Sequence, residues 1–453
     1  MPRLAGPDRL LDLAGAATGL PGVEAVEVLL VRADTTLTRF ADSRIHQNVA
    51  RSDGAARVRV VLTGAGGART GVGVTNELAP EAVRRAAEQA RTAALVTPPD
   101  PSFAGLAEPV DRYPDVDAYD ERTAGATPAL RADLVARMLA ELPRGTFGAG
   151  AVATDAQEVA VANSLGVRAY GRSTRAALRV LASGADSTGY AEAAGTRVGE
   201  LVPEALGERA AGKVARGAHP RELAPGSYPV VLEPMATATL VMWLGWSAFG
   251  GKAVHEGRSP LSGRIGEQVL SPLVTIVDDA TSPLLPDLPF DAEGTPKRPL
   301  PLIERGVAVG VAHDRWSAKL AGAPGSTGHA LPAPGGHGGL PTALLVEAGD
   351  QQLDALVAGL ERGLLVTRFH YTGLVHPTTA TITGMTRDGT FWVEDGRIVH
   401  GVRNLRFTQS IMDALADVRA VGGEAQVSRS FLASIRAPAV RLGSFSFTSA
   451  TAH

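Results

Sequence analysis

Residues 240–281 constrain the fold of this chain most, because they combine a helix pattern, a glycine pair and a strand pattern. From 240 to 249 the apolar residues follow the spacing of a buried helix and not the alternation of a strand. Glycines are common at helix C-termini, so the pair at 250–251 predicts that the helix ends there. The run Leu-Val-Thr-Ile-Val at 273–277 predicts a strand that ends at two aspartates.

The 453-residue chain contains no cysteine, which excludes disulfides, thiolate metal sites and a cysteine nucleophile. Its formal net charge of −3 gives no general attraction to nucleic acid or to an anionic membrane. No apolar run reaches about 18 residues, the length that a membrane span needs. The first residues lack the pattern of a secretory signal. We therefore expect a cytoplasmic protein with neither nucleic acid nor membrane as a partner.

Turn-forming residues divide the chain, which is long enough for two or three domains. The sequence Thr-Pro-Pro-Asp-Pro at 97–101 predicts a linker after a first unit of strands flanked by helices, residues 1–100. Residues 101–220 are predicted to form a central unit of antiparallel strands and helices. Residues 221–453 are predicted to form a larger unit of strands and long loops.

Two stretches about two hundred residues apart carry a resemblance to a known family. Residues 262–269, Ser-Gly-Arg-Ile-Gly-Glu-Gln-Val, followed by Thr-Ile-Val-Asp-Asp at 275–279, resemble the core signature of the TldD/PmbA family. Residues 38–48, Thr-Arg-Phe-Ala-Asp-Ser-Arg-Ile-His-Gln-Asn, are similar to the family's N-terminal motif. The resemblance implies an α+β fold with a small N-terminal α/β meander domain and a larger, mostly antiparallel C-terminal domain.

The family includes a zinc peptidase, TldD, and a sister subunit, TldE, also called PmbA. In the peptidase, a helix just before the core signature carries His-Glu-x-x-x-His. Counting back without gaps places the first histidine at Met242, the glutamate at Trp243 and the second histidine at Ser247. Methionine and tryptophan cannot activate a zinc-bound water, and serine is a rare zinc ligand. The family's third zinc ligand is a cysteine, which this chain lacks, so the chain resembles the TldE side.

The resemblance implies a subunit without catalytic residues or a cofactor of its own. Such a subunit would pair with a TldD-like zinc peptidase, which would hold the zinc. The heterodimer would hydrolyse unfolded or modified peptides or small peptide conjugates. The alternative is an independent metal-free or atypical hydrolase that uses residues outside the family's metal motif.

Two residues near the motif positions are further candidates. Like Trp243, Trp246 is a large side chain at a position where the family has a polar residue. It either packs in the core or fills the space that the zinc site occupies in the peptidase. His255 and Glu256 could form a shifted metal motif. No histidine follows them at helical spacing, however, and the surrounding glycines predict a loop instead of a helix.

Three more candidates, His370, Tyr371 and His376, lie close together in sequence. On one unbroken strand the two histidines would point to the same face, where a metal pair is possible. Gly373 and Pro377 favour a loop interruption instead. The lining of a peptide groove is a third interpretation, and ordinary surface or core histidines are the simplest. The residues that we expect to face a partner or a substrate are Trp246, His255, His370, Tyr371 and His376.

Two other groups of polar residues have simpler interpretations. His329 and His337 lie in a Gly/Pro-rich segment that predicts a solvated loop. Asp278 and Asp279 end the predicted strand at 273–277. They either form a paired carboxylate site or cap a turn, and the turn is favoured.

Overall fold

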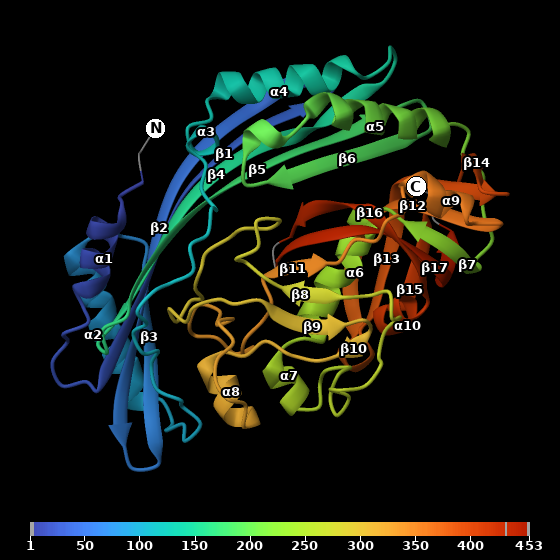
Figure 1. The fold of residues 1–453 in the computed structure, drawn as a ribbon. Helices are drawn as coiled ribbons and strands as arrows, with labels where there is room; N and C mark the ends of the chain where they lie inside the picture. Colours follow the sequence, from blue (N-terminus) through green and yellow to red (C-terminus); the bar gives the residue numbers. More distant parts are fainter. Residues whose placement is uncertain (1–3, 431–432, 451–453) are drawn as a thin grey trace.

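The computed structural model describes residues 4–430 and 433–450, and within them two sheets form two layers (Figure 1). A curved six-stranded antiparallel sheet arches over the C-terminal half of the chain, which is built on an eleven-stranded, mostly antiparallel sheet among these residues. This arrangement confirms the predicted α+β fold, with a small N-terminal α/β meander and a larger C-terminal domain.

The first sheet has the strand order β3-β2-β1-β4-β5-β6, so β1 pairs with β2 on one side and β4 on the other. Alternating apolar residues such as Val26, Val28, Val58 and Val60 bury one face of β1 and β2. The strands are β1 (Ala25–Ala41), β2 (Arg44–Gly64), β3 (Gly67–Thr75), β4 (Phe147–Asn163), β5 (Arg168–Ser183) and β6 (Thr188–Gly195).

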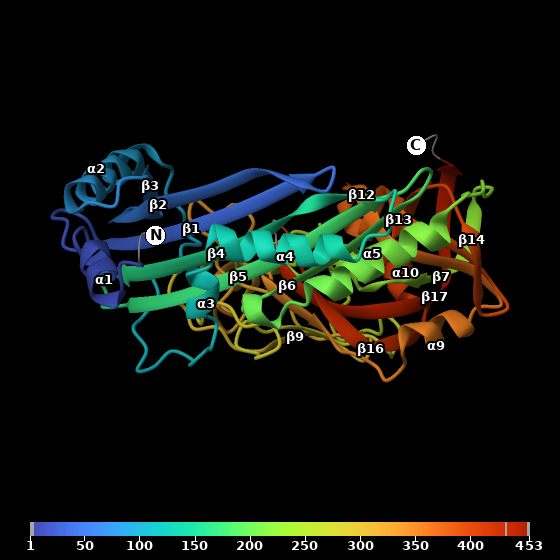
Figure 2. The ribbon, with the colours of Figure 1, turned by 90° about the horizontal axis from the view of Figure 1, so that it is seen from above.

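Helices cover the outer face of this sheet. Figure 2 shows α4 and α5 side by side along it, with α1 and α2 at its other end. A Cβ at Gly71 of β3 would lie 2.0 Å from the carbonyl oxygen of Ala90, and one at Gly73 would lie 1.9 Å from that of Ala86. Glycine therefore lets α2 pack directly on β3. The helices are α1 (Pro7–Gly15), α2 (Pro80–Val96), α3 (Glu121–Ala124), α4 (Pro128–Ala140), the 3-10 turn η1 (Val198–Glu200) and α5 (Pro203–Gly217).

The second sheet surrounds one apolar helix, α6 (Pro234–Ser247). Two of its strand pairs, β7 with β12 and β11 with β17, are parallel. Its strands are β7 (Gly226–Leu232), β8 (Ile276–Asp278), β9 (Leu300–Glu304), β10 (Val307–Ala308), β11 (Ala343–Val346), β12 (Arg362–His376), β13 (Thr381–Glu394), β14 (Arg397–Gly401), β15 (Leu405–Ser410), β16 (Val418–Arg429) and β17 (Ser434–Ala450). The other helical elements are α7 (Gly251–His255), α8 (Arg315–Ala321), α9 (Leu353–Ala358), η2 (Pro377–Thr379) and α10 (Ile411–Ala416).

The structure confirms the helix predicted at 240–249 but corrects its end. Helix α6 ends at Ser247, and Gly250 is the N-cap residue of the next helix, α7, instead of the end of α6. The strand predicted at 273–277 is shorter and later, because Val274 turns back to bond the carbonyl of Ser271 and β8 begins only at Ile276. Asp278 therefore lies inside the strand.

The first two predicted units, 1–100 and 101–220, contribute strands to the same sheet through the pairing of β1 with β4. The predicted linker at 97–101 is held in place: Asp100 pairs with Ala68 through backbone hydrogen bonds and accepts one from the indole of Trp316 at 2.9 Å. The division into three units stays a prediction. In the described part of the chain, no helix has the length and apolar character needed to cross a bilayer.

Candidate functional site

Helix α6 carries the three positions on which the family's zinc motif would fall. It begins at Pro234, which suits a first helical turn because proline has no N–H to leave unpaired. The helix is apolar on every side and packs against β12, β16 and β17, as expected for a helix enclosed by a domain. Met242 and Ser247 are buried, and Trp243 is half-buried.

Met242 is 9% exposed and faces a small cavity of about 140 Å³. The side chains that line this cavity are uncharged, and nearly all are apolar. They are Met242, Gly245, Trp246, Leu331, Leu340, Pro341, Leu344 and Ala433. A flexible thioether in such surroundings fills an irregular gap in the core, so this position now contributes packing.

The side chains at the other two motif positions form hydrogen bonds within the domain. The hydroxyl of Ser247 donates to the backbone carbonyl of Trp243 at 2.7 Å, one turn back in the helix. The indole Nε1–H of Trp243 donates to Oγ1 of Thr372 on β12 at 2.9 Å. The second bond joins α6 to β12, and both side chains are engaged within the domain.

The three side chains do not fit a zinc ion. Zinc in proteins is bound by cysteine, histidine or carboxylate side chains, whereas these positions hold a thioether, an indole donor and a hydroxyl that already donates. Within residues 4–430 and 433–450, no three or more His, Asp or Glu residues are grouped so as to hold a metal ion. The expectation that any zinc belongs to a partner stays a prediction.

Two neighbouring candidates lie at the edge of this region. Trp246 is half-buried, and its ring lies 4.9 Å from that of His337, which is exposed. His255 is also exposed, but it is the last residue of α7, so the predicted loop is wrong. The error arose because Gly250 precedes this helix as its N-cap residue, and Gly257 follows its end.

Strand β12 runs unbroken to His376, so the loop interruption predicted from Gly373 and Pro377 is wrong. Pro377 instead begins the turn η2 after the strand. Register shifts against β13 fall between His370 and His376, so simple alternation does not place the two histidines on one face. His370 is half-buried, and its pKa is lowered first by burial and then by the charge of Arg368.

Tyr371 is the most unusual of the sequence candidates. It is 78% exposed, and its φ of +48° is in the left-handed region that bulky residues rarely adopt. Its ring lies 4.2 Å from that of His370. Such backbone conformations persist where the surroundings enforce them, and they are frequent at functional sites.

Sequence reasoning missed a buried pair, Asp278 and His329. His329 is buried and not in a solvated loop, and its Nε2 lies 2.8 Å from Oδ1 of Asp278. The other carboxylate oxygen accepts backbone N–H bonds from Thr342 and Ala343. Burial alone would raise the pKa of Asp278, but His329 holds it well below its usual range. The favoured turn-cap role therefore belongs only to Asp279, which accepts bonds from Thr281.

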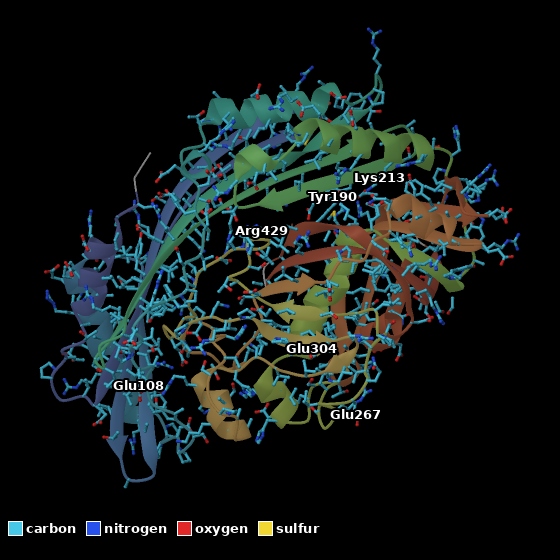
Figure 3. The ribbon with its side chains drawn as sticks, viewed as in Figure 1. Glu108, Tyr190, Lys213, Glu267, Glu304 and Arg429 are labelled. Carbon is cyan, nitrogen blue, oxygen red and sulfur yellow. The ribbon has the colours of Figure 1, made fainter. Side chains whose placement is uncertain are left out.

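A second missed pair joins the two layers. Lys213 of α5 donates to Glu233, the residue just before α6, at 2.6 Å, and Thr367 donates to the same carboxylate at 3.1 Å. Lys213 also bonds the carbonyl of Tyr190, and Figure 3 places both residues between the layers. The pair lines a cavity of about 250 Å³. The only signal in the sequence was that lysine, rare in this chain, occurs in an otherwise apolar helix face.

Comparison with known proteins decides the family. Three domains of one family match the chain in order: the PmbA/TldA metallopeptidase domain 1 over residues 26–94, the central domain over residues 118–217 and the C-terminal domain over residues 225–449. The chain belongs to the TldD/PmbA family. The fold described above is therefore a TldD/PmbA fold, and the mapping of its zinc motif onto Met242, Trp243 and Ser247 stays a prediction.

Among curated TldD/PmbA relatives, Metalloprotease PmbA of Escherichia coli O157:H7 is 26% identical over 379 residues, covering 79% of each chain. The Metalloprotease TldD homolog of Haemophilus influenzae is 28% identical over 213 residues, 44% of this chain and 43% of that protein. The chain thus spans less than half the length of that TldD homolog. The crystal structure of TldE from Thermococcus kodakarensis superposes with a TM-score of 0.85 at 22% identity, covering 98% of this chain and 99% of that one, which shows a shared fold.

Proposed function

We propose that this chain is a TldE-like subunit without catalytic chemistry of its own, which pairs with a TldD-like zinc metallopeptidase. The heterodimer would hydrolyse unfolded or modified peptides or small peptide conjugates. In this proposal the partner supplies the zinc and the catalytic carboxylate, and this chain supplies part of the wall around the peptide. We also expect the pair to act in the cytoplasm.

The environment of Met242 carries the proposal. In a zinc peptidase the first motif position must present a ligand to the metal, yet here it packs in an apolar cavity beside Trp246 and Leu344. Trp243 and Ser247 are engaged in hydrogen bonds. The fold of the family is kept over the whole described chain, while the positions that would perform the chemistry contribute packing.

An interface with a partner would explain why this chain keeps the family fold although it lacks the metal ligands. Tyr371 supports this view, because a large aromatic side chain is held exposed on a backbone conformation that costs about 1–3 kcal/mol. Aromatic residues of this kind are frequent anchors at protein interfaces. We therefore expect the C-terminal domain to contact the partner over well above about 1,000 Å², the size of a specific interface.

The test is co-purification with a TldD-like peptidase from the same genome, combined with peptide hydrolysis. The mixture is expected to form a stable complex and to hydrolyse an unfolded peptide, whereas this chain alone is inactive. Tyr371→Ala should weaken the complex by about tenfold or more. Val96→Ala, which shortens an equally exposed apolar side chain on α2 of the other layer, should not.

Two results would contradict the proposal. A peptidase that is fully active alone and never co-elutes with this chain would remove the partner role. Peptide hydrolysis by this chain alone, retained after chelation, would favour the independent hydrolase.

A further inference from the structure

A cavity of about 260 Å³ lies between the two layers, apart from α6 and its motif positions. One wall comes from β1, β4 and β5, and the other from the segments 287–297 and 329–332. Much of the lining is apolar, including Leu29, Val31, Val159 and Phe290. The polar side chains gather around Lys297 and Arg175. The cavity is smaller than the usual site of a drug-sized ligand, and suits a molecule about the size of one amino acid.

Lys297 is the unexpected residue in this cavity. It is 7% exposed, yet its Nζ donates only to the hydroxyl of Thr342, at 2.8 Å. Among the described residues no carboxylate lies within ion-pair distance of Nζ, although the charges of Asp278 and Asp287 act on Lys297 from farther away. Buried charges in proteins are normally paired, so an ammonium with two unused protons at a cavity wall requires an explanation.

The acidic groups near Lys297 are already occupied. Asp278 bonds His329 and two backbone N–H groups. Asp287 accepts from Arg175 at 3.1 Å and from the backbone of Leu288. In the described structure neither carboxylate accepts a hydrogen bond from the ammonium of Lys297.

The third carboxylate of the region, Asp291, is held by the backbone. It accepts three N–H bonds, from Glu293, Thr295 and Ala330. Burial, followed by the charge of Glu293, raises its pKa to about 7. Near neutral pH its negative charge is therefore partly lost, which lowers the repulsion that it would exert on an anion in the cavity.

A second unused donor lies on Arg175. Its Nε is buried and has no acceptor within the described residues, although its NH2 group pairs with Asp287. The Nε of Arg429 is likewise buried and without an acceptor. Burial and the charge of Arg175 lower the pKa of Arg429 to about 10. Figure 3 shows Arg429 between the layers.

We propose that this cavity binds a small monocarboxylate with an apolar body, such as the carboxyl end of an apolar amino acid. The carboxylate accepts hydrogen bonds from Lys297 and from Nε of Arg175, and the apolar body packs against Val31, Val159 and Phe290. A single charge is favoured because the ionised Asp287 at the cavity wall would repel a dianion. The site is formed by this chain alone, so it does not depend on the partner proposed above.

The test uses the full chain and isocaproate, which is leucine without its amino group. Binding is measured by calorimetry and by the rise in melting temperature that a ligand of the folded state produces. The neutral isocaproamide tests whether binding needs the negative charge, and acetate tests whether binding needs the apolar body. Both are expected to bind about tenfold or more weakly than isocaproate, since each loses one part of the recognition.

The variant Lys297→Met removes the ammonium while keeping an apolar chain of similar length. It is expected to weaken isocaproate binding about tenfold or more, because the carboxylate loses one of its two donors. Lys297→Arg should retain most of the binding. The control is Lys319→Met, which removes an exposed ammonium outside the cavity. This variant should bind isocaproate as tightly as the unaltered chain does.

Three outcomes would overturn the proposal. The first is no detectable isocaproate binding, which would mean that only water accepts hydrogen bonds from Lys297 and Arg175. The second is equal binding of isocaproate and isocaproamide. The third is unaltered binding by a folded Lys297→Met variant. If that variant does not fold, the comparison of the three probes on the unaltered chain still decides the matter.

Discussion

Lys213 and Glu233 form a buried ion pair that joins helix α5 of the first layer to the start of α6 in the second, with Nζ and Oε2 2.6 Å apart. The pair fixes the N-terminal end of the helix that carries the motif positions. It also positions the cavity that lies between β6 and the C-terminal sheet. The relation between the two layers therefore depends on a few buried charges as well as on apolar packing.

Glu233→Gln is expected to destabilise the protein by about 3–5 kcal/mol, because it leaves Lys213 buried without its counter-charge. The measurement is the free energy of unfolding in denaturant. Glu204→Gln breaks the ion pair with Arg137 on the surface, and it should change stability little because solvent screens that pair. Equal effects of the two substitutions would show that the buried pair has no special role.

Asp278→Asn should destabilise the protein in a pH-dependent way. Since the pKa of Asp278 is held below its usual range, its ionised form stabilises the folded state above about pH 4, the unfolded value. That contribution is lost as the pH falls toward the folded pKa. The difference in unfolding free energy between the two proteins is therefore expected to be constant near pH 6 and to shrink below about pH 4. A difference that grows on acidification would contradict this assignment.

Met242→Ala should cost about 2–5 kcal/mol, because it enlarges an apolar cavity in the core. Met242→Leu keeps the volume and should cost less than about 1.5 kcal/mol. Thermal and denaturant unfolding would measure both. If the alanine variant proved as stable as the leucine variant, Met242 would not be the packing residue that its burial indicates.

The isolated chain is expected to bind no stoichiometric zinc, since Met242, Trp243 and Ser247 offer no suitable ligand. Restoring the motif with Met242→His, Trp243→Glu and Ser247→His should still not create a working site, because the chain lacks cysteine and the surrounding side chains were not arranged to orient ligands. Elemental analysis and a peptidase assay check both statements. About one tightly bound zinc per chain in the unaltered protein would show that the expectation is wrong.

Local patterns in the sequence were sufficient for much of the fold and for the family. The apolar spacing at 240–249 indicated the enclosed helix α6, and the run at 273–277 indicated the strand whose ordered part is β8. Both follow from the fixed geometry of helices and strands, which places side chains at known intervals. The motif at 262–269 indicated the family, and counting from it predicted that Met242 stands where the zinc peptidase has its first metal ligand.

Only the tertiary structure decided which polar groups meet. His329 lies 51 positions from Asp278 in sequence and Glu233 lies 20 from Lys213, and nothing in their local sequence indicates either partner. The helix at His255 also escaped prediction, because the glycine pair that predicted a helix end also supplies Gly250, the N-cap residue of α7. Likewise, Lys297 is an ordinary lysine in the sequence. The packing of two distant segments against the first sheet is what buries it, because a contact between segments far apart in the chain depends on the whole fold and not on local spacing.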